Sequence, residues 1–434
     1  RRRSRSALFF TMPSRYLQQV QLLPGPGQEP EPSDVLLRDG AIQAIGGAAA
    51  REAEDLGLAP EAAAGWLLAP ALVDPHSVLE DPCHGAAETL ASLERSAIAA
   101  GYGTVALLPR AHSWRDTPDQ LTLPARNSGL NLALWAAFSS GGAGQELAPH
   151  GDLLQAGAIG LAEGPACPPL PLLDRGLSLG EMGEAPVLLA PRDPSLSQQG
   201  FVREGVEALR AGWPTDPVLS ETLPLQNLLT LAAAHPARRL TLMNLSTAAA
   251  VEQLAAHPAP GRPAASVCWW HLLADSGNLA ATAEGWRMEP PLGRPSDRQS
   301  LQAGLRSGVL SAVAVHHQPL DAEEQLLPLD QRKPGVAGHR FVLPCLWQEL
   351  VVQQGWSVRE LWQALCFGPA ALLGLEPPRL EIGCRHWLLY DPERPWRARS
   401  RAQGDSTAPL AANQPLLGAE LLGQVIATGL GPEG

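Results

Sequence analysis

The sequence predicts an α/β fold: a parallel (β/α)8 barrel of the TIM type, with a small β-sandwich domain formed from both ends of the chain. Two observations support the barrel. Short apolar runs alternate with segments of helical period between about residues 70 and 375. Seven or eight such alternations over about 300 residues favour a closed parallel barrel over an open sheet. A third observation, strand-like texture at both termini, supports the β-domain.

Each barrel strand is expected at an apolar run. The first run covers residues 70–73, and seven more follow it. These runs span residues 103–108, 130–137, 158–161, 186–190, 240–245, 266–269 and 309–315. Helical period is seen in between, for example at residues 86–100, 224–234 and 248–256. In such a barrel the chemistry lies at the carboxyl ends of the strands, so functional side chains are expected there.

The β-domain is predicted from short strands near both termini. The clearest signal is a hairpin, in which the Asp39-Gly40 pair joins runs at 35–38 and 41–45, because Asp-Gly supplies the positive φ of a two-residue turn. We therefore divide the chain into three parts. They are a disordered extension at 1–15, in which Met12 is the expected true start, a β-domain at 16–68 plus 378–434, and a barrel at 69–377.

Composition excludes several functional classes. A net charge of −12 argues against nucleic acid or an anionic membrane as a partner. No apolar run approaches the roughly 20 residues that a membrane-spanning helix needs. The six cysteines form no CxxC pair, which indicates free thiols in a cytoplasmic protein and not a disulfide framework. The oligomeric state stays open, and a homo-oligomer is one option.

Polar residues follow several of the apolar runs that are predicted as strands. The histidines among these polar residues suggest the first functional hypothesis. They form a candidate metal cluster of His76, His271, His316 and His317. The alternative, that each histidine caps or packs, is favoured because neither HxH nor HxxxH occurs. His316 and His317 are neighbours, and adjacent strand residues point to opposite faces.

Two further pairs have a functional and an ordinary interpretation. Asp74 and Asp81 flank His76, and two carboxylates could serve acid–base chemistry, although a strand-end turn and a helix cap are the favoured explanation. Trp269 and Trp270 could stack on a planar ligand, whereas such pairs usually belong to the core.

The order of fragments along nearly the whole chain resembles the dihydroorotases, within the amidohydrolase superfamily that includes allantoinases and hydantoinases. The segment PALVDPHSVLEDPC (70–83) resembles the signature that runs into His-x-His-Leu-Arg. The segments AAGYGTVALLP (99–109), ETLPLQNLL (221–229) and NLST (244–247) resemble the helices and strands that follow. So do MEPPLGRPSDRQSLQAGLRSGVLSAVAVHHQP (288–319), KPGVAG (333–338) and FGPAALLGL (367–375).

The resemblance implies zinc chemistry, in which the metal lowers the pKa of a bound water from 15.7 to about 7. Carried over residue by residue, the metal ligands are mostly replaced. The first histidine survives as His76, while the other ligand positions hold Val78, Ala162 or Glu163, Ala190 and Asn244. A carboxylated lysine is excluded as the bridge, because the single lysine is Lys333.

The positions that the resemblance assigns to substrate binding and proton transfer are replaced as well. The catalytic Asp is His316, the Arg that would hold the substrate carboxylate is Glu80, and two substrate-binding Asn are Arg110 and Glu289. We therefore predict no zinc or other cofactor, and a catalytically inactive dihydroorotase-like protein of pyrimidine biosynthesis.

The resemblance implies aspartate carbamoyltransferase as a partner, since some inactive members serve as its scaffold. One alternative is an active cyclic-amide hydrolase with a rebuilt site, formed by His76, Glu163, His316 and His317. Another is a small-molecule binding protein that uses the old pocket. The candidate lining residues of that pocket are His76, Arg110, Trp269, Trp270, His271, His316 and His317.

Overall fold

A computed structural model describes residues 13–430 except 125, 127, 278–286 and 329–330. Met12 and the rest of residues 1–12 lie outside the described part. Among the described residues no helix is both long and apolar enough to cross a bilayer.

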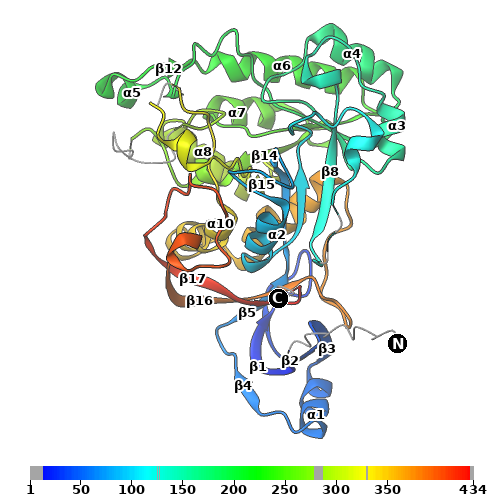
Figure 1. The fold of residues 1–434 in the computed structure, drawn as a ribbon, viewed down its shortest axis with the longest axis vertical. Helices are drawn as coiled ribbons and strands as arrows, with labels where there is room; N and C mark the ends of the chain where they lie inside the picture. Colours follow the sequence, from blue (N-terminus) through cyan, green and yellow to red (C-terminus); the bar gives the residue numbers. More distant parts are fainter. Residues whose placement is uncertain (1–12, 125, 127, 278–286, 329–330, 431–434) are drawn as a thin grey trace, which may run out of the picture.

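The centre of the molecule is a barrel of eight parallel strands (Figure 1). The strands follow the chain in order and are β6 (Leu72–Ser77), β7 (Tyr102–Leu107), β8 (Asn131–Ala137), β9 (Gly160–Ala162), β10 (Pro186–Leu189), β13 (Arg239–Leu242), β14 (Ala264–Cys268) and β15 (Ala312–Ala314). Nearly all their side chains are buried, as expected for strands with helices on one side and the barrel interior on the other. The predicted barrel is confirmed.

Side chains of β6 close the seam between the first and last strands. The Asp74 carboxylate accepts from the backbone N–H of Val315 at 3.0 Å, and the Ser77 hydroxyl accepts from that of His317 at 2.9 Å. The carbonyl of His317 in turn accepts from the backbone N–H of Val78 at 2.8 Å. Asp74 and Ser77 thus supply hydrogen bonds where β6 and β15 have no regular ladder.

Helices surround the barrel, and several begin where the sequence places a cap. Thr89 accepts from the Ser92 N–H at the start of α2, and Thr247 does the same for Ala250 in α7. The outer helices are α2 (Leu90–Ala99), α3 (His150–Gln155), α4 (Leu170–Leu179), α5 (Val206–Ala211), α6 (Leu219–Ala234), α7 (Ala248–Ala256), α8 (Pro295–Arg306), α9 (Ala322–Gln325), α10 (His339–Leu346), α11 (Val358–Trp362) and α12 (Gly368–Leu373). Two short strands, β11 (Val202–Arg203) and β12 (Thr215–Asp216), pair outside the barrel.

The two chain ends meet in one seven-stranded mixed sheet, in the order β17-β16-β5-β1-β2-β3 with β4 beside β1. Its strands are β1 (Arg15–Leu22), β2 (Glu31–Arg38), β3 (Ala41–Ile45), β4 (Pro60–Ala62), β5 (Leu67–Pro70), β16 (Trp387–Arg397) and β17 (Glu420–Thr428). It is a single sheet where we expected a sandwich, and α1 (Gly47–Asp55) packs on one face of it. Arg15, expected in a disordered extension, already pairs with Leu37. The Asp39-Gly40 hairpin is confirmed, with φ of 50° and 77°.

Candidate functional site

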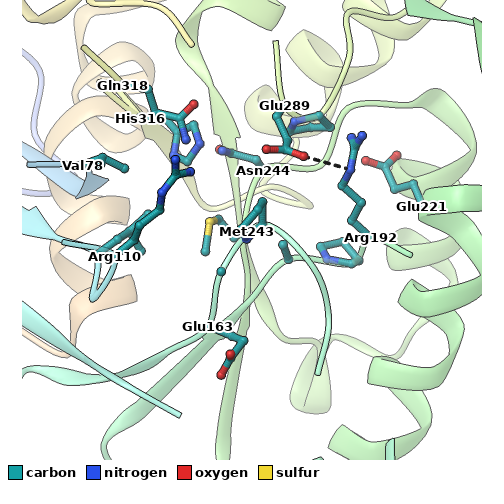
Figure 2. Close-up of a pocket in the computed structure, with 16 residues that line it drawn as sticks. Val78, Arg110, Glu163, Arg192, Glu221, Met243, Asn244, Glu289, His316 and Gln318 are labelled. Carbon is teal, nitrogen blue, oxygen red and sulfur yellow. Dashed lines mark ion pairs between the residues drawn. The ribbon is translucent and has the colours of Figure 1, made fainter. Parts of the chain in front are cut away.

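A cavity of about 500 Å³ lies at the carboxyl ends of the barrel strands, where this fold places its chemistry (Figure 2). It is lined by Val78, Leu108, Arg110, Glu163, Gly164, Pro165, Ala190, Pro191, Arg192, Glu221, Met243, Asn244, Glu289, Pro290, His316 and Gln318. The structure therefore brings together residues from seven of the positions that the sequence singled out: Val78, Arg110, Glu163, Ala190, Asn244, Glu289 and His316.

The remaining candidates do not line this cavity. Glu80 pairs with Arg110 at 3.2 Å, and both side chains are partly exposed. Trp269 and Trp270 belong to the hydrophobic core, which is the ordinary interpretation of such a pair. His271 is buried and contacts the carbonyl of Pro290 at 2.9 Å through Nε2. His317 does not line the cavity, and its Nε2 lies 3.4 Å from the Glu88 carboxylate.

His76 is completely buried and forms a chain of contacts with His316 and Ser266. Its Nδ1 lies 3.0 Å from Nδ1 of His316, and its Nε2 lies 2.8 Å from the Ser266 hydroxyl. Burial, the larger cause, and the neighbouring His316 hold the pKa of His76 well below its usual range. Burial likewise lowers the pKa of His316 to about 4. Both rings are therefore neutral near pH 7, and the Nδ1–H of one ring donates a hydrogen bond to Nδ1 of the other.

Two cavity residues that end strands have unusual backbone conformations. His316 follows β15 with a φ of 47°, and Asn244 follows β13 with a φ of 53°. Positive φ is uncommon for residues other than glycine and often marks functional positions. The side-chain amide of Asn244 is buried, and neither its oxygen nor its nitrogen has a hydrogen-bond partner in the structure. The two strand ends thus have left-handed backbone conformations, and they carry Asn244 and His316 where the resemblance places a ligand histidine and the catalytic Asp.

The Glu163 carboxylate is held by its neighbour and not directed to a metal. Its Oε2 accepts from the Ser139 backbone N–H at 2.9 Å, and its Oε1 accepts from the Ser139 hydroxyl at 2.7 Å. Burial raises the pKa of Glu163, and the two Ser139 hydrogen bonds oppose that shift. The side chain is therefore fixed in the wall of the cavity.

Behind His317 lies a second buried group of polar side chains. His317 Nε2 is 3.4 Å from Glu88, and His339 Nε2 is 3.0 Å from Asp74. Burial lowers the pKa of His339, while the hydrogen bond with Asp74 opposes that change. Since Asp74 also bonds across the barrel seam, this group holds the strand ends in place and lies outside the cavity lining.

Sequence reasoning missed an ionic network on the opposite wall. Arg192 lines the cavity, lies 3.5 Å from Glu289 and donates to Asp216 at 3.1 Å. Asp216 also accepts from the completely buried Arg203 at 3.0 Å. The polar segment APRDPSL after β10 was a usable signal for Arg192. Nothing in local periodicity points to the pairing of Arg203 with Asp216, which lie on two short strands outside the barrel.

The chain is similar over most of its length to proteins that are named for one activity. A probable dihydroorotase-like protein of Synechocystis sp. is 33% identical over 395 residues, which is 83% of this chain and 87% of that protein. The chain belongs to the dihydroorotase family. A dihydroorotase of Thermus aquaticus is 29% identical, over 87% of this chain and 90% of that enzyme. A dihydroorotase-like protein of Pseudomonas aeruginosa is 28% identical, over 90% and 92%.

Solved structures support the fold of this dihydroorotase-family chain. The L-hydantoinase (dihydropyrimidinase) of Arthrobacter aurescens superposes with a TM-score of 0.76 at 16% identity, covering 95% of this chain and 94% of that one. A D-hydantoinase of Thermus sp. gives 0.70 at 18% identity, covering 94% and 92%. No protein-family model matches the chain. These likenesses show the fold of the chain and nothing finer.

The donor atoms in this dihydroorotase-family cavity do not fit the zinc site that the resemblance implies. Both ring nitrogens of His76 are engaged by His316 and Ser266. Val78 and Ala190 carry no donor, and the oxygens of Glu163 are taken by Ser139. Across the described part of the chain, no three His, Cys, Asp or Glu side chains are grouped so that they could hold a metal ion.

Proposed function

We propose that this protein is a non-catalytic member of the dihydroorotase family in pyrimidine biosynthesis. The single observation behind this proposal is the chemistry of the strand-end cavity. Its walls contain Val78, Ala190 and Asn244 where the resemblance places ligand histidines, and the surviving His76 is bound to other side chains. Removing even the groups that orient a ligand typically costs 10- to 100-fold in metal affinity or activity.

The substrate side of the cavity supports the same proposal. The resemblance places a carboxylate-binding Arg at Glu80, and this Glu80 forms an ion pair with Arg110. The charge of Arg110 is thus already compensated within the protein. Glu289 likewise pairs with Arg192 at 3.5 Å. An anionic dihydroorotate would meet carboxylates or paired arginines in place of an open cationic site.

An active enzyme with a rebuilt metal site receives less support. It would need His76, Glu163, His316 and His317 to converge on one ion. His317 points out of the cavity toward Glu88, and Glu163 is bonded to Ser139 on another strand end. The alternative therefore requires rearrangement of a buried network.

We expect purified protein to carry much less than one zinc ion per chain. The reason is the absence of a converging ligand set among the described cavity residues. Elemental analysis after expression in zinc-supplemented medium and mild chelation measures this directly, with the T. aquaticus dihydroorotase prepared in parallel. A stoichiometric ion that is lost in a His76→Ala variant would contradict the proposal.

We further propose aspartate carbamoyltransferase as the protein partner that the resemblance implies, in the cytoplasm. The unpaired state of all six cysteines supports that compartment. Exposed apolar side chains support a protein partner, because such side chains at a surface often mark interfaces. Four of them lie on α5 and at the start of α6: Val206, Leu209, Leu219 and Leu223.

Co-purification of the carbamoyltransferase from the same organism tests this partner. We expect the wild-type chain to retain it and a Leu209→Glu, Leu219→Glu variant to lose it. Ile382→Glu, at an exposed apolar residue elsewhere in the chain, is the matched control and should retain it. If all three proteins fail to retain the enzyme, the partner is wrong, while the proposal of inactivity is unaffected.

A further inference from the structure

A second cavity, of about 1050 Å³, lies where the barrel meets the terminal sheet. Its walls come from α2, α10, β16, β17 and the loop after β16, and it shares no lining residue with the first cavity. In Figure 1, α2 and α10 are neighbours above β16 and β17. Three arginines line it, namely Arg340, Arg397 and Arg399.

Arg340 has an incompletely used guanidinium. Its side chain is 10% exposed, and its Nη1 donates to Asp405 at 2.9 Å. Its Nε and Nη2 are buried, and neither has a hydrogen-bond partner in the structure. These two groups point along one edge, and this edge pairs with two oxygens of a carboxylate or phosphate. Arg15 uses the same two nitrogens on Glu61, at 2.9 and 2.7 Å.

An ordinary structural role explains only part of this arrangement. The Arg340 guanidinium lies over the Phe341 ring at 5.0 Å and near the Trp396 ring at 5.9 Å, and the Asp405 contact adds an ion pair. These contacts fix the side chain in place. They leave two strongly polar N–H groups buried without an acceptor, which is costly for a charged group.

The charge of the surrounding wall favours an anion. Arg397 and Arg399 are exposed, whereas Asp405 is the one carboxylate among the lining residues. Three cations therefore face one anion, in a chain whose net charge is −12. A ligand with two or more negative charges would balance this local excess.

We propose that this cavity binds a multiply charged oxyanion of the phosphate-ester class. Two ligand oxygens pair with Nε and Nη2 of Arg340, while Arg397 and Arg399 balance the remaining charge. Asp405 competes with the ligand through its charge, because its carboxylate already neutralises the guanidinium through Nη1, outside the Nε–Nη2 edge. Because Nε and Nη2 are buried in the structure, binding requires the side chains that cover this edge to move aside.

Titration calorimetry with pyrophosphate, at low salt and on the full chain, tests this site. We expect binding to the wild type, and Arg399→Gln should weaken it roughly tenfold through loss of one charged contact. Asp405→Asn should tighten it several-fold because the competing charge is removed. Arg51→Gln, on the exposed surface of α1, is the matched control and should change nothing.

The opposite response of two variants keeps the test independent of folding, because destabilisation would not tighten binding. The absence of binding at millimolar pyrophosphate would overturn the proposal. So would equal affinities for the wild type, Arg399→Gln and Asp405→Asn. Binding of succinate without binding of pyrophosphate would overturn the assignment to phosphate esters.

Discussion

Purified protein supplemented with zinc is expected to show no measurable interconversion of carbamoyl aspartate and dihydroorotate. Two independent losses motivate this result. The positions for the metal hold Val78, Ala190 and Asn244, and the catalytic acid–base position holds His316, whose pKa is lowered to about 4 by burial. A neutral imidazole bound to His76 is a poor substitute for a carboxylate that shuttles a proton.

The substrate side adds a second obstacle to turnover. The Glu80 carboxylate stands where the resemblance places the clamp for the substrate carboxylate. Glu80 lies outside the cavity lining and pairs with Arg110 at 3.2 Å, so neither side chain offers an unpaired cation to the substrate carboxylate. Productive binding is therefore disfavoured before any chemistry begins.

Single reversions such as Val78→His are expected to restore nothing measurable, because catalytic groups act as a unit and their effects are not additive. The deficit relative to the T. aquaticus dihydroorotase should be on the order of 10³-fold or more. The assay follows both directions of the reaction, and growth of a strain that lacks dihydroorotase provides an independent readout. Turnover above background, or growth without added pyrimidine, would show that the site has been rebuilt.

The fold was predictable because the spacing of apolar residues along the chain marks the positions of its strands and helices. All eight barrel strands lie on or beside apolar runs, and the Asp39-Gly40 turn has the conformation that its residues favour. Strand lengths were less predictable. The run at 309–315 shrinks to β15 (Ala312–Ala314), because Gly308 has a φ of 78° and the Leu310 N–H bonds back to Gly304. Such a local turn cannot be predicted from the number of apolar residues in a run.

The site was predictable only in part, for a related physical reason. Strand ends converge in a barrel, so residues directly after strands, such as Asn244 and His316, could be grouped from the sequence. The direction in which each side chain points could not be predicted from the sequence. His76 was expected in the pocket lining, yet it points into the barrel toward Ser266. Ion pairs between distant segments, such as Arg203 with Asp216, have no periodic signature.

Replacing Asp216 with alanine is expected to lower the free energy of unfolding by about 3 to 5 kcal/mol, the range for breaking a buried ion pair. Arg203 is completely buried, and Asp216 accepts from its Nη1 at 3.0 Å and from Arg192 at 3.1 Å. Removal of the carboxylate leaves a buried guanidinium whose nearest remaining carboxylate is Glu221 at 3.5 Å. Urea unfolding followed by circular dichroism measures the change, and Asp55→Ala, at an exposed residue of α1, should stay within about 0.5 kcal/mol.

A double variant separates the loss of an interaction from the cost of an orphaned charge. Arg203→Met combined with Asp216→Ala removes both members of the completely buried pair, and Arg192, which also bonded to Asp216, keeps Glu289 at 3.5 Å. Removing both members of a buried pair is often much less costly than removing one. We therefore expect the double variant to be more stable than Asp216→Ala alone, with a coupling energy of about 1 to 3 kcal/mol. If the double variant were as unstable as the sum of both single variants, the pairing of Arg203 with Asp216 would not be what stabilises this wall of the cavity.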